Sequence, residues 1–193
     1  TVFILIWALR LGSYLFLRIL KDKEDRRFKE WKTSFPLFLR TWTLQGMWVF
    51  LTSVSGVTAI CSRVSLEPGL YFYVGCSLWI FGFLFESISD YQKRKFKIKN
   101  PKDFISSGLW SLSRHPNYFG EIVLWIGITI IAFPVLQGYQ LFSLISPLFV
   151  IWLLTKVSGI PLLEKHADKT WGKKKEYKVY KDSTPVLFPN FFK

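Results

Sequence analysis

The residues best suited to chemistry lie at 113–121, where the chain reads SRHPNYFGE. Proline suits the first position of a helix and disfavours helical geometry in the residue before it, so we expect a helix to begin at Pro116. The free N–H groups at that helix start, with Arg114 and His115 as further donors, would bind a phosphate or a carboxylate. Helix capping and anchoring at the membrane interface are the simpler alternative for the same residues.

Acidic side chains at helical spacing occur in two places. Asn117 and Glu121 are four residues apart, so they share one face of the predicted helix just inside the bilayer, where a carboxylate needs a partner or a function. Glu86, Asp90 and Arg94 are also spaced by four, which aligns them on one stripe of a helix that leaves the membrane. A self-paired ladder on a solvated face explains this stripe more simply. However, the stripe leaves the membrane at the same face as the predicted anion site, which favours the hypothesis that both belong to one functional site.

A third group lies near the C-terminus, where Glu164 and His166 are followed by Gly172, Tyr177 and Tyr180. His166 on its own is typical of a surface residue, and we carry it with Glu164 and Tyr177 as a candidate cofactor contact. The chain has two histidines, with no helical histidine pair, and two cysteines that lie inside or beside apolar runs. We therefore expect no metal site and no disulfide framework.

Long uncharged runs determine the elements that must position these groups. No Asp, Glu, Lys or Arg occurs within 41–62, 68–85 or 122–155. The last run has 34 residues and would be about 51 Å long as a single helix, too long for a hydrocarbon core of about 30 Å, so it must fold back near Pro134 and Gly138. With the apolar start of the chain, these runs predict an all-α, polytopic integral membrane bundle of about five transmembrane helices, forming a single domain over 1–193.

The charge distribution fits the same topology. The net charge is +13, and the segments 21–32, 93–114 and 156–193 hold six, seven and nine of the lysines and arginines. The connections between them carry almost no net charge, which is the positive-inside pattern and predicts that the basic loops and the C-terminal tail are cytoplasmic. Membrane topology therefore explains the basic composition better than nucleic-acid binding does. We expect membrane lipids as partners and no nucleic acid.

In these residues the chain resembles the steroid 5-alpha-reductase superfamily, most closely its bacterial membrane branch, and one motif is also similar to a signature of sterol reductases. The resemblance implies a helical membrane fold with a cytoplasmic cavity for NADPH and a bilayer cavity for a lipid-like substrate. It further implies that the reaction is hydride transfer to a C=C bond conjugated to a carbonyl. The matching pieces are residues 7–10, 24–28, 85–94, 106–110, 113–121 and 158–164.

Carried over residue by residue, the resemblance implies cofactor contacts for Asp90, Asn117, Tyr118 and Glu121. Glu86 stands where the steroid enzymes have an asparagine. This departure leaves the cofactor preference open.

The resemblance also bears on the phosphates and on the proton donor. We expect Arg114, Lys97 and Arg94 to hold the cofactor phosphates, although Lys97 replaces an arginine of the steroid enzymes. Their proton-donating tyrosine aligns near Trp7, so the catalytic acid is unknown; Tyr14 lies nearly on the same helix face and is a candidate substitute. Because the chain opens in helix-like sequence without a start methionine, we expect it to lack N-terminal helices of the full protein that supply this acid, and to be inactive in turnover without them.

The motif RHPxYxG is shared more loosely with integral-membrane methyltransferases that act on isoprenylcysteine or phospholipids and bind S-adenosylmethionine. Those enzymes also have a C-terminal acidic motif followed by a glycine and two tyrosines, resembled here by Glu164, Gly172, Tyr177 and Tyr180. They typically have paired glutamates, whereas Lys165 follows Glu164 here. S-adenosylmethionine-dependent methylation of a lipid or prenylated substrate therefore stays as the alternative function, and a non-catalytic lipid-binding protein as a third.

Overall fold

The computed structural model describes residues 1–22 and 34–192, and over this part of the chain the secondary structure is helical, with no strand. The long helices are α1 (Val2–Asp22), α2 (Phe35–Ile60), α3 (Leu70–Lys99) and α5 (Pro116–Ala132). Four stretches are long and apolar enough to cross a membrane, namely Phe35–Ile60, Leu70–Lys99, Pro116–Val135 and Gly138–Trp171, and Val2–Leu17 is a shorter apolar helix. The predicted all-α membrane bundle is confirmed.

The remaining elements are short and lie around the turns. Residues between the long helices form α4 (Leu109–Leu112) and the 3-10 turns η2 (Phe133–Val135) and η3 (Gly138–Leu144). The last span is then built from α6 (Ile145–Trp152), the π-helical segment η4 (Leu153–Val157) and α7 (Ile160–Trp171), and α8 (Lys175–Ser183) follows. The predicted fold-back near Pro134 and Gly138 therefore occurs, but the span after it is irregular at both ends of α6.

Two predicted helix boundaries can be compared directly with the structure. The helix after the central loop begins at Pro116, as the proline predicted. The helix predicted to carry Glu86, Asp90 and Arg94 out of the membrane ends at Lys99, because the charged segment after Glu86 consists largely of residues that favour helices. The stripe of acidic residues therefore remains on one rigid element that runs from the membrane into the polar end of the molecule.

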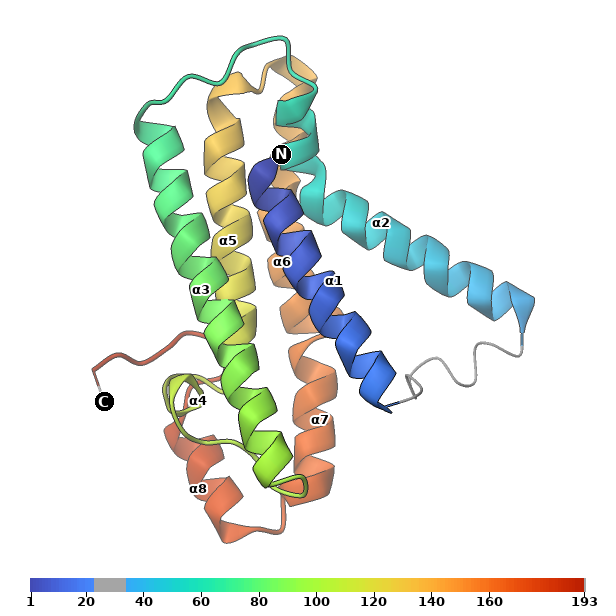
Figure 1. Cartoon of the computed structure of the whole chain (residues 1–193), viewed down its shortest axis with the longest axis vertical. Helices are drawn as coiled ribbons and strands as arrows, with labels where there is room; N and C mark the ends of the chain where they lie inside the picture. Colours follow the sequence, from blue (N-terminus) through green and yellow to red (C-terminus); the bar gives the residue numbers. More distant parts are fainter. Residues whose placement is uncertain (23–33, 193) are drawn as a thin grey trace.

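Close packing of α3 on α5 depends on two glycine pairs. A Cβ atom added at Gly82 would lie 2.6 Å from the carbonyl oxygen of Gly120, and one added at Gly75 would lie 2.7 Å from that of Gly127. The two backbones can approach this closely only because neither helix has a side chain at these points. Figure 1 shows α3 and α5 side by side along most of their length.

The buried core lies beside this helix pair, where α1 and α6 pack on it. Trp79, Leu124 and Trp125 form its centre, and α1 contributes Phe3 and Trp7. The ring of Phe3 lies 4.7 Å from that of Trp79, and Trp7 meets Trp125 edge-on at 5.0 Å between centroids. These aromatic contacts fix α1 against the middle of α3 and α5.

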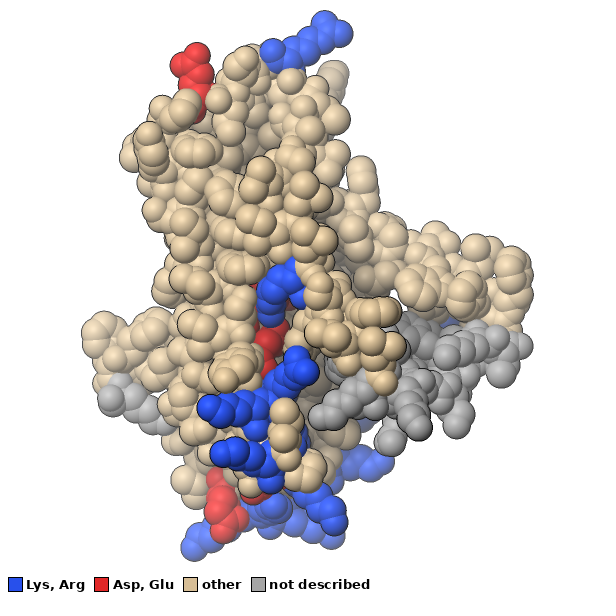
Figure 2. Space-filling model, in the orientation of Figure 1, with Lys and Arg blue, Asp and Glu red and all other residues tan. Residues whose placement is uncertain are grey.

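The polar elements gather at one end of the bundle. Figure 1 shows α4, α7 and α8 together with the lower part of α3, while the connection 61–69 and the turn after α5 lie at the opposite end. Figure 2 shows Lys and Arg side chains concentrated at the same lower end, below a band with almost no charge. Two of the three predicted basic segments, 93–114 and 156–193, therefore share one end. Most of the third, 21–32, and the matching piece 24–28 lie outside the described residues.

Candidate functional site

An open cavity of about 230 Å³ lies at the basic end of the bundle, where the lower part of α3 meets α4, α7 and α8. Its polar lining consists of Lys93, Lys97, Arg114, His115, Glu164 and His166. Its larger aromatic lining residues are Phe104, Trp110, Trp171, Tyr177 and Tyr180. We call this the basal cavity; its lining combines cations with flat rings, which suits a ligand that is anionic and aromatic.

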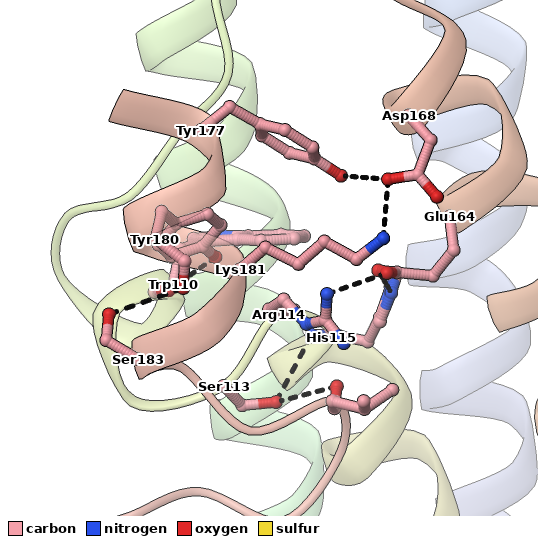
Figure 3. A network of polar contacts seen from close by, with 11 residues as sticks. Trp110, Ser113, Arg114, His115, Glu164, Asp168, Tyr177, Tyr180, Lys181 and Ser183 are labelled. Carbon is pink, nitrogen blue, oxygen red and sulfur yellow. Dashed lines mark hydrogen bonds and ion pairs between the residues drawn. The ribbon is translucent and has the colours of Figure 1, made fainter. Parts of the chain in front are cut away.

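The start of α5 supplies the inner wall of the basal cavity. Glu164 on α7 contacts both residues before the helix: its Oε2 forms an ion pair with Arg114 Nη1 at 2.8 Å, and its Oε1 is in hydrogen-bond contact with His115 Nε2 at 2.7 Å (Figure 3). The Nδ1 atom of His115 is buried without a hydrogen-bond partner. Arg114 and His115 thus stand together at a helix start, as the sequence predicted, and Glu164 is the acidic partner of both. The Nε and Nη1 atoms of Arg114 are buried without a hydrogen-bond partner.

Two lysines of α3 lie over the aromatic rings of the basal cavity. Lys93 Nζ is 4.6 Å from the centre of the Trp110 ring, and Lys97 Nζ is 4.7 Å from that of Trp171. Lys97 also donates to the carbonyl oxygen of Asp103 at 2.6 Å. These cation–π contacts hold positive charge at the cavity wall without placing a carboxylate directly on it.

The outer wall is α8, whose tyrosines point back towards α4 and α7 (Figure 3). Tyr180 donates to the carbonyl oxygen of Trp110 at 2.7 Å, and Tyr177 donates to Asp168 Oδ1 at 3.3 Å. Lys181 pairs with the same carboxylate oxygen of Asp168 at 2.6 Å. Burial, together with the neighbouring carboxylates of Glu164 and Asp168, raises the pKa of Tyr177 to about 12, and burial also raises the pKa of Tyr180. Both phenols are therefore neutral hydrogen-bond donors at physiological pH.

A second polar group lies deeper, between the membrane-spanning helices. Arg10 of α1 pairs with both Glu86 and Asp90 of α3. Asn117 contacts Asp90 from α5, and Glu121 is close enough to Glu86, Asp90 and Arg10 to interact with them electrostatically. One oxygen of Glu86, Oε2, is buried without a hydrogen-bond partner. We call these five residues the buried acidic cluster.

The structure divides the predicted site residues between these two regions. Asp90, Asn117 and Glu121 belong to the buried acidic cluster. Tyr118 lies between the regions, stacked on the ring of His115 at 5.7 Å, and Arg94 is exposed and lines neither region. The predicted residues that line the basal cavity are Lys97, Arg114, His115, Glu164, His166 and Tyr177.

Arg10 and Lys93 were not among the predicted site residues. Because Arg10 pairs with Glu86 and Asp90, the alternative of a self-paired ladder with Arg94 is wrong for those two acids. An available signal was Arg10 itself, since an arginine inside an apolar helix needs an acidic partner within the membrane. Among the described residues, no group of three His, Cys, Asp or Glu side chains could hold a metal ion.

Comparison with known proteins adds a family but no function. Neither a curated protein nor a solved structure matches the chain. A family match covers residues 1–184, which includes both the basal cavity and the buried acidic cluster. The chain belongs to the DUF1295 family, a family of unknown function that is associated with steroid 5-alpha-reductase-like proteins.

Proposed function

We propose that this chain belongs to a membrane oxidoreductase that transfers a hydride from NADPH to a C=C bond conjugated to a carbonyl in a lipid-like substrate. The observation that carries the proposal is the basal cavity, where Arg114, Lys93 and Lys97 line a space walled by indole and phenol rings. It lies at the membrane edge, next to polar side chains that reach between the spans. This arrangement suits a phosphate-bearing nucleotide outside the bilayer that meets an apolar substrate within it.

The cavity residues meet the chemical needs of a dinucleotide. Phosphates need cations and N–H donors, which Arg114, Lys93 and Lys97 supply, and a base needs flat rings, which Trp110 and Trp171 supply. A volume of about 230 Å³ is below the usual range for a drug-sized ligand, so the cavity would hold one part of NADPH and leave the rest along the α3 surface. Arg94, exposed on α3, is then available for a phosphate outside the cavity.

The buried acidic cluster would orient the reactive end of the cofactor. Asn117 and Asp90 offer an amide and a carboxylate beside each other, a combination that can bind a carboxamide or a ribose hydroxyl. Glu121 and Tyr118, on the same helix, would complete this contact. The apolar spans around the cluster exclude water, which protects a hydride donor and strengthens polar contacts.

The balanced reaction defines what the protein must supply. NADPH provides the hydride, which reaches the β-carbon of the conjugated system, and a proton must reach the α-carbon to give the saturated carbonyl and NADP⁺. Productive transfer needs the reacting atoms held about 3 to 3.5 Å apart. The chain's own contribution is therefore to position both partners and to direct a proton, and the residue that donates this proton is not assigned.

S-adenosylmethionine is a second candidate because of one specific feature, the pair formed by Glu164 and Arg114. An adjacent carboxylate and guanidinium match the ammonium and carboxylate groups of an amino acid, and S-adenosylmethionine carries both. Aromatic rings such as Trp171 would suit its sulfonium and its adenine. In that case the protein would be a methyltransferase acting on a lipid or prenylated substrate.

The two candidates are separated by titrating the purified protein in lipid nanodiscs with NADPH and with S-adenosylmethionine. We expect NADPH to quench the fluorescence of Trp110 and Trp171 and to show energy transfer to the nicotinamide. A Trp110→Phe, Trp171→Phe variant is the matched control and should lose most of this signal. Binding of S-adenosylmethionine alone would overturn the reductase proposal. A panel of apolar enones, assayed by loss of nicotinamide absorbance, then tests turnover.

The same proposal places the basic end of the molecule in the cytoplasm, where NADPH is available. Its support is the clustering of lysine and arginine at that end, which follows the positive-inside rule (Figure 2). In a variant with Cys61 and Cys76 replaced by serine, a cysteine introduced for Lys173, in the exposed turn between α7 and α8, should react with a membrane-impermeant thiol reagent only after the cells are opened. Labelling in intact cells would indicate the opposite orientation, with the basic end outside the cytoplasm.

A further inference from the structure

The C-terminal residues 184–192 run across the start of α5 and bond to the segment that carries Arg114. The backbone N–H of Arg114 donates to the carbonyl oxygen of Pro185, and the N–H of Asn190 donates to that of Leu112, both at 2.9 Å. The hydroxyl of Ser113 donates to the carbonyl oxygen of Leu187 at 2.9 Å. We call residues 184–192 the C-terminal strap; it holds in place three consecutive residues, 112–114.

Side chains of the strap point in two directions. Leu187 packs against the bundle core, and Thr184 is buried. Phe188, Phe191 and Phe192 are exposed instead, with 74%, 56% and 99% of their surface accessible. A short peptide that exposes three phenylalanines in water would be unfavourable, so the surroundings of these rings matter.

The neighbours of the strap show how deep it lies. The Phe191 ring is 6.4 Å from that of Phe85 on α3, and the Phe188 ring is 6.2 Å from that of Phe119 on α5. Phe85 is the sixteenth residue of α3, which begins at Leu70, and so lies about 22 Å along a helix whose first 30 Å would fill a hydrocarbon core. A ring in contact with Phe85 is therefore at the depth of the lipid chains or the headgroup boundary.

We propose that the C-terminal strap re-enters the membrane, with Phe188, Phe191 and Phe192 inserted among lipids, and that this anchor positions Arg114 and His115. The partner is the bilayer interface, where aromatic side chains are favoured. The strap leaves the bundle beside the lower end of α5 and runs outwards from it (Figure 1). The strap carbonyls accept hydrogen bonds from residues 113 and 114. Insertion of the phenylalanines into lipid therefore holds these residues, and with them the inner wall of the basal cavity, in position. This inference does not depend on which cofactor the cavity binds.

The first test measures the surroundings of the strap. With Cys61 and Cys76 replaced by serine, an environment-sensitive dye is attached to a Phe192→Cys variant in nanodiscs, with Lys173→Cys as the control position. We expect blue-shifted emission at position 192, quenched at least about threefold more strongly by lipid-borne quenchers than at position 173. A water-like spectrum would overturn the proposal. A blue-shifted dye that lipid quenchers do not reach would also overturn it, because protein would then cover the strap.

The second test measures coupling to the cavity without any ligand. In a Phe188→Asn, Phe191→Asn variant we expect hydrogen exchange of the Arg114 amide to become about tenfold faster or more, because its acceptor Pro185 is released. Phe188→Leu with Phe191→Leu keeps the apolar anchor and should retain protection, as should Val179→Asn, which changes an exposed residue of α8. Unchanged exchange in the asparagine variant would overturn the coupling. Helical circular dichroism and gel filtration confirm that each variant is folded.

Discussion

The basal cavity and the buried acidic cluster both contain an arginine paired with carboxylate, in opposite settings. In the cluster, Arg10 faces Glu86, Asp90 and Glu121, so acids outnumber cations among these residues. In the cavity, Arg114 shares Glu164 with His115, and two lysines add to the positive charge. The same pair therefore sits in an acidic setting inside the bilayer and in a basic one at its edge.

This difference determines what each pair can do. Between the spans no water can replace a lost partner, so Arg10 must stay bound to its acids for the helices to remain packed. At the cavity, an anionic ligand can replace Glu164 on Arg114, and Glu164 can keep its contact with His115 or turn to solvent. We therefore expect Arg10 to act on stability and Arg114 to act on binding.

The largest effect should come from Arg10→Ala. Removing one partner of a buried ion pair costs about 3 to 5 kcal/mol, because Glu86 and Asp90 would be left as unpaired acids within the membrane. The measurement is the free energy of unfolding in detergent or bicelles. Arg40→Ala, at an exposed position of α2, is the control and should change little. Adding Glu86→Gln and Asp90→Asn to Arg10→Ala should recover much of the loss; no recovery would mean that Arg10 acts through packing alone.

The next effect is on binding. Arg114→Ala should weaken NADPH binding by about 1.5 to 3 kcal/mol, the scale of a charge-assisted hydrogen bond, with a much smaller change in unfolding free energy than for Arg10→Ala. Lys174→Ala is the matched control, since Lys174 bonds only to the exposed Asp103 at 3.1 Å among the contacts described. The expectation for Lys174→Ala is no more than about a twofold change. Equal losses for both variants would indicate diffuse electrostatic attraction and no defined anion site.

Much of this architecture could be predicted from local sequence. Uncharged runs predicted the spans, and the proline at 116 predicted the start of α5, because both signals act within a few residues of the structure that they determine. Arg114 and His115 are the two residues before that proline, so their position at the membrane edge followed directly. Glu164, His166 and Tyr177, the predicted cavity residues on α7 and α8, were singled out as a group near the C-terminus, and the resemblance to methyltransferases also pointed to Glu164 and Tyr177.

What could not be predicted depends on contacts between distant segments. Arg10 and Glu86 are 76 positions apart, and they meet only because Phe3 and Trp7 seat α1 on the core. Acids spaced by four on α3 give no indication of which helix will face them. The C-terminal strap likewise bonds to residues 112–114 through its backbone, and no side-chain pattern reports backbone pairing between distant segments.

The glycine contact between α3 and α5 offers a smaller test of the same contrast. A Cβ atom at Gly120 would lie 2.6 Å from the backbone nitrogen of Glu86, so Gly120→Ala should separate the helices and cost about 1 to 3 kcal/mol. Gly46→Ala is the control, because nothing lies within 4 Å of its Cβ position; in the middle of α2 it should be neutral or stabilise by up to about 1 kcal/mol.

The two glycine variants are compared by thermal unfolding and by cofactor titration. Because Gly120 packs on the α3 backbone at Glu86, Gly120→Ala should lower the unfolding temperature while reducing NADPH affinity less than Arg114→Ala does. A loss of affinity with unchanged stability would show that the cluster, and not the cavity, controls binding. That outcome would contradict the assignment of stability to the buried acidic cluster and of binding to the basal cavity.

The smallest effect concerns Tyr177, which tests the packing of the basal cavity without a ligand. Its pKa is raised from 10 to about 12, so between pH 10 and pH 12 the unfolded chain has lost the phenolic proton while the folded chain keeps it. The stability that this phenol contributes is therefore fully present below pH 10 and is lost as the pH rises towards 12. Tyr177→Phe should make the stability curve flatter over that interval and remove a late step from the alkaline ultraviolet titration of the tyrosines. Tyr139→Phe, which removes a phenol that is 89% exposed, should leave the late step in place. If Tyr177→Phe instead removed an early step, α8 would not be closed over the cavity.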